Sequence, residues 1–196
     1  MPISDCEVRD PRIRRTRQLL QTALQDLLRG KSLDEISVQD ITDAATVNRA
    51  TFYDHYTDKF ALFEATVAGG FHALLHERNV RFDGTCSSAV GAIVLAACDY
   101  LTRTDSSPEG CKKHSAFQPL MDAAITSAIR LVLMEGIQKG DKRAAGRALS
   151  PELIGNAASW ALYGAVKQWL ETPNHAPAEK IAPLISEIVI TMIDAA

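Results

Sequence analysis

The segment from Ser37 to Phe63 reads SVQDITDAATVNRATFYDHYTDKFALF, and its pattern is the strongest local signal in the chain. Ser37 is a favourable N-cap, and Asp40 three residues later completes a capping box in which Asp replaces the usual Glu. Asn48 is a second N-cap, placed just before another short helix. Two short helices joined by a tight turn and followed at once by a longer helix predict a helix-turn-helix arrangement.

Helical periodicity extends outward from this segment over almost the whole chain. Leu20, Ala23, Leu24 and Leu27 recur at the spacing of one helix face, and no stretch shows sustained alternation with a period of two. The sequence therefore predicts an all-α fold of about nine helices. Helices are expected over about residues 12–28, 38–45, 49–56, 58–81, 88–103, 119–138, 151–171 and 179–195.

The composition is that of a globular protein. The chain has 196 residues, of which 46% are hydrophobic and 23% charged. No apolar run reaches the roughly 18 residues that a membrane span needs, and the polar N-terminus lacks a secretory signal, so we expect a cytoplasmic protein. The four cysteines form no CxxC pair and are expected to be free thiols. Without a GxSxG, HExxH or Gly-rich phosphate motif, the sequence does not predict an enzyme or a cofactor.

The basic residues gather near the N-terminus. Five arginines and one acid lie between Arg9 and Arg17, although the whole chain has a formal net charge of -3. Any surface for nucleic acid must therefore be a local patch.

The helix-turn-helix segment resembles the DNA-binding region of the TetR (tetracycline-repressor-like) family of transcriptional regulators. The resemblance spans about residues 12–63 and is most specific in VNRATFYDHY, at 47–56, followed by Asp58-Lys59. One departure is Thr46, because the family usually places Gly there for a backbone with positive φ. We expect a slightly different turn at this position.

The resemblance implies a DNA-contacting surface on the two short helices, the start of the next helix and the N-terminal arm. Asn48 and Arg49 are the best candidates for reading bases, since both side chain types pair with base edges. Lys59, at a helix N-terminus, is expected beside a phosphate. The aromatic members are expected to donate to phosphates. The full set comprises Arg12, Arg14, Arg15, Gln39, Thr42, Asn48, Arg49, Ala50, Thr51, Tyr53, His55, Tyr56 and Lys59.

The same resemblance implies two domains: residues 1–57 would bind DNA, and residues 58–196 would bind an effector and dimerise. A homodimer on a palindromic operator is the usual way to gain specificity from one such motif. Small or apolar stripes on the last two helices predict the dimer interface. It comprises Ile154, Ala157, Ala161, Gly164, Ala165, Gln168, Ile181, Leu184, Ile185, Ile188 and Met192. The residues expected to line an effector pocket are Cys98, Tyr100, Phe117, Met121, Trp160 and Tyr163.

These features together predict a sequence-specific transcriptional regulator, most simply a repressor released from its operator by a small molecule. A helical protein-interaction adaptor on the same fold is an alternative. A thiol- or metal-responsive regulator is another, because His72/His76 and Cys111/His114 are incomplete ligand pairs. The sequence leaves open the effector, the operator, and whether the regulator represses or activates.

Overall fold

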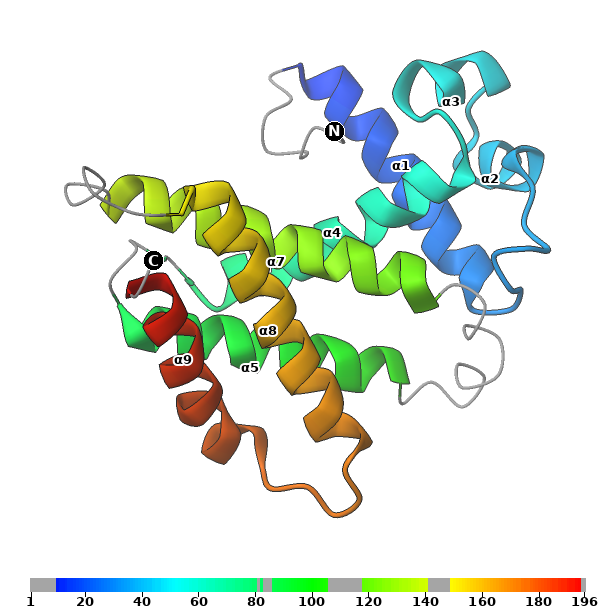
Figure 1. Cartoon of the computed structure of the whole chain (residues 1–196). Coiled ribbons are helices and arrows are strands. Elements are labelled where there is room, and N and C mark those ends of the chain that lie inside the picture. The colour runs from blue at the N-terminus through cyan, green and yellow to red at the C-terminus, as the bar shows by residue number, and fades with distance from the viewer. Residues whose placement is uncertain (1–9, 81, 83–85, 106–117, 141–148, 195–196) are drawn as a thin grey trace. The chain divides into compact units, whose positions relative to one another are not determined.

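A computed structural model describes residues 10–80, 82, 86–105, 118–140 and 149–194 of the chain (Figure 1). The described residues form eight helices and no strand, which confirms the all-α prediction. Within these residues, no helix combines the length and hydropathy that a membrane-spanning segment requires. The helices are α1 (Pro11–Leu28), α2 (Val38–Ala45), α3 (Arg49–His55), α4 (Lys59–Glu77), α5 (Ser87–Asp105), α7 (Gln118–Gly140), α8 (Pro151–Glu171) and α9 (Ala178–Asp194).

The chain divides into two compact units. The first contains residues 1–70 and 111–124, and the second contains residues 71–110 and 125–196. The division runs through α4 and α7, so each of these helices contributes residues to both units. The boundary expected after residue 57 stays a prediction.

In the first unit, α1 packs against α2, and α2 packs against α3. The apolar face predicted for the first helix is buried there, since Leu20 and Leu24 are fully inaccessible to solvent. Ile41 of α2 and Phe52 of α3 are fully buried as well. These side chains form the core that holds the two short helices, which alone would be too short to be stable in water.

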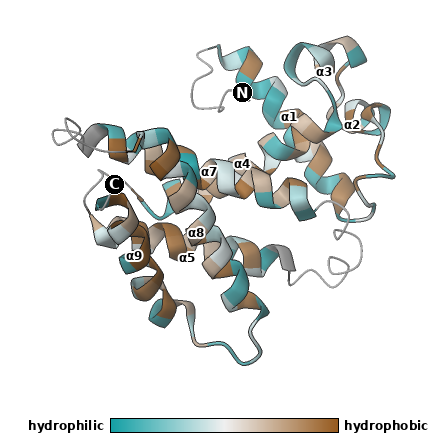
Figure 2. Cartoon of the chain, viewed as in Figure 1, coloured by the Kyte–Doolittle hydropathy of each residue, from teal (hydrophilic) through white to brown (hydrophobic). Residues whose placement is uncertain are grey.

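In the second unit, α5 packs against α8 and α9, and α8 also packs against α9. Ile93, Leu162 and Val189 are fully buried, one from each of these helices. Figure 2 shows hydrophobic residues along most of α9. Arg78 and Asp99 form an ion pair between the end of α4 and α5.

The predicted and observed bounds of a helix agree best where the sequence contains a recognisable capping residue. The structure starts α8 with Ser150 as N-cap and Pro151 as its first residue, and ends it at Glu171, as predicted. The expected end of α4 at residue 81 is wrong, because Asn79 adopts a left-handed backbone with a φ of 51°. The Val80 amide then donates to the Leu75 carbonyl at 3.0 Å, which closes the helix early.

Candidate nucleic-acid interface

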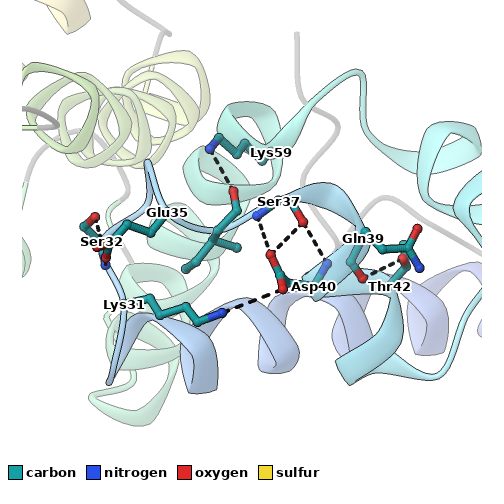
Figure 3. A network of polar contacts seen from close by, with 9 residues as sticks. Lys31, Ser32, Glu35, Ser37, Gln39, Asp40, Thr42 and Lys59 are labelled. Carbon is teal, nitrogen blue, oxygen red and sulfur yellow. Dashed lines mark hydrogen bonds and ion pairs between the residues drawn. The ribbon is translucent and has the colours of Figure 1, made fainter.

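The start of α2 is fixed by the predicted capping box, which the structure confirms. The Ser37 hydroxyl accepts from the Asp40 amide at 3.1 Å, and the Asp40 carboxylate accepts from the Ser37 amide at 2.8 Å (Figure 3). Hydrogen bonds from Ser37 hold the pKa of Asp40 below its usual value, and the nearby Lys31 ammonium, 3.7 Å away, acts in the same direction. The first helix of the motif therefore begins at a defined residue.

The turn between α2 and α3 has a left-handed backbone at Thr46, with a φ of 56° and a ψ of 43°. The Val47 amide donates to the Thr42 carbonyl at 3.0 Å, and the Thr46 amide donates to the Asp43 carbonyl at 3.2 Å. The expectation of a different turn is therefore wrong. Thr46 adopts the conformation that glycine would adopt, because these hydrogen bonds and the buried helices on either side impose it.

Asn48 begins the second helix of the motif as its N-cap. Its side-chain oxygen accepts from the Thr51 amide at 2.7 Å and from the Thr51 hydroxyl at 2.9 Å. The oxygen that would contact a base is thus already bonded within α3. The structure thus confirms the predicted N-cap role of Asn48, and its contact with a base stays a prediction.

Arg49, Ala50, Tyr53 and Asp54 are the exposed residues of α3. Tyr53 has an exposed fraction of 47%, whereas its neighbour Phe52 is completely buried. An Arg49 guanidinium nitrogen donates to the Tyr53 hydroxyl at 3.2 Å, and the guanidinium carbon lies 5.6 Å from the centre of the Tyr53 ring. This face presents a cation and a phenol together, which suits contact with base edges or phosphates.

Tyr56 and Thr42 lie in the packing of the first unit. Tyr56 is 7% exposed, and its hydroxyl accepts from Gln21 of α1 at 3.2 Å. The guanidinium of Arg17 lies 5.7 Å from the centre of its ring. Thr42 is 1% exposed, and its hydroxyl donates to the Gln39 carbonyl at 3.0 Å. Tyr56 thus contacts α1, Thr42 bonds within α2, and neither side chain belongs to the exposed face.

Lys59 lies at the first position of α4, as predicted, but its ammonium is bonded within the protein. It donates to the backbone carbonyls of Leu33, Asp34 and Ile36 at 2.8, 3.1 and 2.8 Å. Figure 3 shows it directed at the segment that precedes Ser37.

The other predicted contacts are at least partly accessible. Gln39 is exposed, and its side-chain amide donates to the Asp43 carboxylate at 2.7 Å. Thr51 and His55 are half-buried. Burial is the main cause that lowers the pKa of His55, and the positive charge of Arg17 adds to it. The predicted arginines of the arm are exposed on the first turns of α1; they are Arg12, Arg14 and Arg15.

The residues predicted to contact an effector differ in exposure, and their role stays a prediction. Cys98 is 1% exposed, and burial raises the pKa of its thiol to about 11. Burial also raises the pKa of Tyr100 to about 12. Tyr163 is buried, whereas Trp160 is 50% exposed. Met121 is buried in a segment assigned to the first unit, and Phe117 lies outside the described residues.

The second unit contains an open groove of about 560 Å³ between α5 and α9. Apolar side chains such as Leu95, Pro183 and Ile190 line it, together with Glu179 and Glu187. None of the predicted effector residues within the described part of the chain lines this groove.

The predicted dimer residues divide into a buried and an exposed group. Ile154 and Ile185 are 3% and 5% exposed, so they pack inside their own unit. Two large apolar residues of α8 that were not predicted for the interface are also exposed, Leu153 at 52% and Trp160 at 50%. The helical spacing of these two residues could have placed them on one face of α8. The predicted residues that are exposed are Ala157, Gly164, Gln168, Leu184 and Ile188, and those that are half-buried are Ala161, Ala165, Ile181 and Met192.

The incomplete pair His72/His76 gains no third ligand among the described residues. No group of three His, Cys, Asp or Glu side chains occurs there that could hold a metal ion. His72 is half-buried and His76 is exposed. Cys111 and His114 lie outside the described residues.

Comparison with known proteins agrees with this geometry. Residues 19–66 match the family described as "Bacterial regulatory proteins, tetR family". The uncharacterized HTH-type transcriptional regulator YxbF of Bacillus subtilis (strain 168) is 42% identical over 59 residues, which are 30% of this chain and 16% of that protein.

Solved structures share the fold over nearly the whole chain. A TetR transcriptional regulator from Streptococcus agalactiae 2603V aligns with a TM-score of 0.52 at 19% identity, over 96% of this chain and 98% of that one. The dihydroxyacetone kinase operon activator DhaS also aligns with a TM-score of 0.52, at 15% identity, over 92% of this chain and 97% of that one. Residues 19–66, which begin in α1 and end in α4, therefore form a helix-turn-helix DNA-binding domain that matches the tetR family of bacterial regulatory proteins.

Proposed function

We propose that this protein is a homodimeric, cytoplasmic transcriptional repressor that binds a palindromic operator and is released by a small-molecule effector. The exposed pair of Arg49 and Tyr53 on α3 carries the sequence-reading part of this proposal, because a capped and buried frame holds both side chains. The first domain would end near residue 57, and the remainder would bind the effector and dimerise.

An exposed apolar face on α8 and α9 supports the homodimer. Leu153 and Trp160 on α8 are 52% and 50% exposed, and Leu184 and Ile188 on α9 are each 58% exposed. Ala157 and Gly164 lie on the same side of α8, where small side chains allow close approach of another helix. Large exposed apolar residues gathered on neighbouring helices are typical of an interface. A second copy of the chain would bury this face around a two-fold axis.

The groove between α5 and α9 supports the effector part. Its volume of about 560 Å³ is that of a small-molecule site, and its lining is mostly apolar. An effector that binds one conformation of the dimer better would shift the population toward it. Release follows if the two recognition helices of that conformation no longer fit successive major grooves.

Selection of duplexes from a random DNA library at a stated salt concentration tests the DNA-binding part. Wild type is run beside Arg49→Ala and beside Arg29→Ala, which removes the same charge from the end of α1. We expect wild type and Arg29→Ala to enrich one palindrome. Arg49→Ala should bind that palindrome about 1–3 kcal/mol more weakly and with relaxed specificity, as expected for loss of a base contact.

Two outcomes would contradict this proposal. If Arg49→Ala weakened binding to all sequences equally, the guanidinium would contact phosphate and would not read a base. If folded, dimeric wild type enriched no sequence, the adaptor alternative would replace the DNA-binding proposal. Repression itself is measured with a reporter gene placed behind the enriched palindrome, whose output should rise when the regulator is deleted.

A further inference from the structure

We propose that Lys59 is a positioning residue, which holds the segment before α2 against the start of α4 and makes no contact with a DNA phosphate. This proposal rests on the DNA-binding function and concerns how the reading helix is held. It departs from the expectation, drawn from the position of Lys59 at a helix N-terminus, that its charge lies beside a phosphate.

The hydrogen bonds of the ammonium group carry the proposal. A lysine ammonium has three donors and no acceptor. The three carbonyls that accept from it, those of Leu33, Asp34 and Ile36, lie at 2.8, 3.1 and 2.8 Å. The Phe60 ring centre lies 5.5 Å from the same nitrogen, on the next residue of the helix. With all three donors bonded, a phosphate contact would require Lys59 to give up bonds it already has.

The carbonyls that accept from Lys59 belong to the segment of residues 33–36, whose buried backbone requires hydrogen-bond partners. Leu33 and Ile36 are 2% and 1% exposed, so their backbone lies in the core of the unit and requires hydrogen bonds there. The segment contains only two backbone hydrogen bonds of its own, from Glu35 to Ser32 and from Ile36 to Leu33, at 3.1 and 3.3 Å.

The hydrogen bonds of Lys59 position α3, the helix that carries Arg49, through their effect on α2. Ile36 directly precedes the N-cap Ser37, so the ammonium fixes the point at which α2 begins. The packing of α2 against α3 and the turn at Thr46 then determine where the Arg49 side chain lies. Hydrogen bonds from a charged donor are stronger than those between neutral groups, so one lysine can hold this segment in place.

The salt dependence of DNA affinity distinguishes positioning from phosphate contact. The probe is the duplex that wild type enriches from the random library. Each phosphate contact contributes about -0.9 to the slope of log affinity against log salt, so losing one contact in each protomer of a dimer changes the slope by about 1.8. We expect Lys59→Gln to weaken binding about tenfold with the wild-type slope. Arg15→Gln, on the exposed arm, is the control expected to make the slope shallower.

The conservative variant Lys59→Arg sharpens the test. Arginine keeps the charge, so a phosphate contact would survive with nearly wild-type affinity. A planar guanidinium, however, does not direct three donors from a single nitrogen, so a positioning role predicts that Lys59→Arg also binds weakly. A shallower slope for Lys59→Gln together with full rescue by arginine would overturn the proposal.

Reductive methylation of the wild-type protein gives a test that needs no variant to fold. We expect the Lys59 amine to react slowly with or without the enriched duplex, while the exposed Lys180 reacts quickly in both. Rapid methylation of Lys59 in the free protein, with protection by DNA, would overturn the proposal. Because slow methylation is measured without DNA, failure of wild type to bind any duplex would contradict the proposed function and leave the positioning of Lys59 supported.

Discussion

Thr46 adopts a backbone conformation that is unfavourable for its own side chain. Its φ of 56° lies in the left-handed region, where a β-branched residue is a genuine outlier. The left-handed conformation costs an L-residue about 1–2 kcal/mol, whereas glycine adopts it readily. Thr46 keeps this conformation because the turn must join two short helices whose packing stabilises it.

We predict that Thr46→Gly raises the free energy of unfolding by about 1 kcal/mol, since it relieves this strain. Urea denaturation of the two proteins measures the difference. Thr57→Gly is the matched control, because Thr57 is exposed and its φ is not positive. Equal effects of the two substitutions would show that the turn at Thr46 is not strained.

For single residues, the sequence predicted the position in a helix better than the contacts of the side chain. Asn48 and Arg49 were placed at the start of the reading helix, where the structure has them. The sequence did not predict the intramolecular partners of Tyr56 and Lys59, because these partners come from elsewhere in the chain. Gln21 lies 35 residues from Tyr56, and the Leu33 carbonyl lies 26 residues from Lys59. Local spacing carries no information on such contacts.

At the scale of elements, capping residues determine where the helices of the motif begin. Ser37 and Asp40 bond reciprocally at the start of α2, and Asn48 caps α3. Because α2 has eight residues and α3 seven, each depends strongly on its first hydrogen bonds.

We predict that Ser37→Ala lowers the free energy of unfolding by about 1 kcal/mol, the usual cost of removing an N-cap. Amide hydrogen exchange should become faster in α2 first, because the lost cap satisfies an amide of its first turn. Ser37→Thr, which keeps the hydroxyl, should retain most of the stability. A uniform increase in exchange across the whole chain would contradict a local role for the cap.

Capping residues also explain which ends of the helices could be predicted from the sequence. The starts of α2, α3 and α8 were predicted from Ser37, Asn48 and Ser150, each of which caps its helix in the structure. The end of α4 was missed because Asn79 takes the left-handed conformation more often reserved for glycine. A helix end of this kind depends on the direction that the following residues take, which local sequence does not specify.

At the scale of the whole molecule, the exposed face of α8 and α9 is predicted to hold two copies together. We expect Ile188→Glu to shift the protein toward monomers, because a charge would be buried at the proposed interface. Sedimentation velocity measures the change, and affinity for the palindrome should fall with it. Leu131→Glu, at a residue of α7 that is 42% exposed, is the control and should leave the dimer intact. A dimer that survives Ile188→Glu would place the interface elsewhere.

Histidine burial makes stability depend on pH. Burial, only partly opposed by the charge of Glu135, lowers the pKa of His72 below its usual value of 6.5, so the folded state favours the neutral ring. The unfolded chain therefore binds protons first as the pH falls, and the stability that this neutral histidine contributes is present above about pH 6.5 and is lost below it.

We predict that the free energy of unfolding decreases as the pH is lowered from about 6.5 toward 5. His72→Gln should make this decrease smaller, and His55 should account for part of what is left, because burial lowers its pKa too. Urea denaturation at several pH values checks the prediction. An unchanged pH profile in His72→Gln would show that His72 does not contribute.

Gly136 on α7 shows how closely the second unit constrains its own sequence. A Cβ atom at this position would overlap the ring of Phe82, which is itself only 6% exposed. A side chain at residue 136 therefore requires the Phe82 ring to move or residue 82 to become smaller. The effect of a substitution at one of these positions thus depends on the residue at the other, so a change tolerated in one version of the protein can be rejected in another.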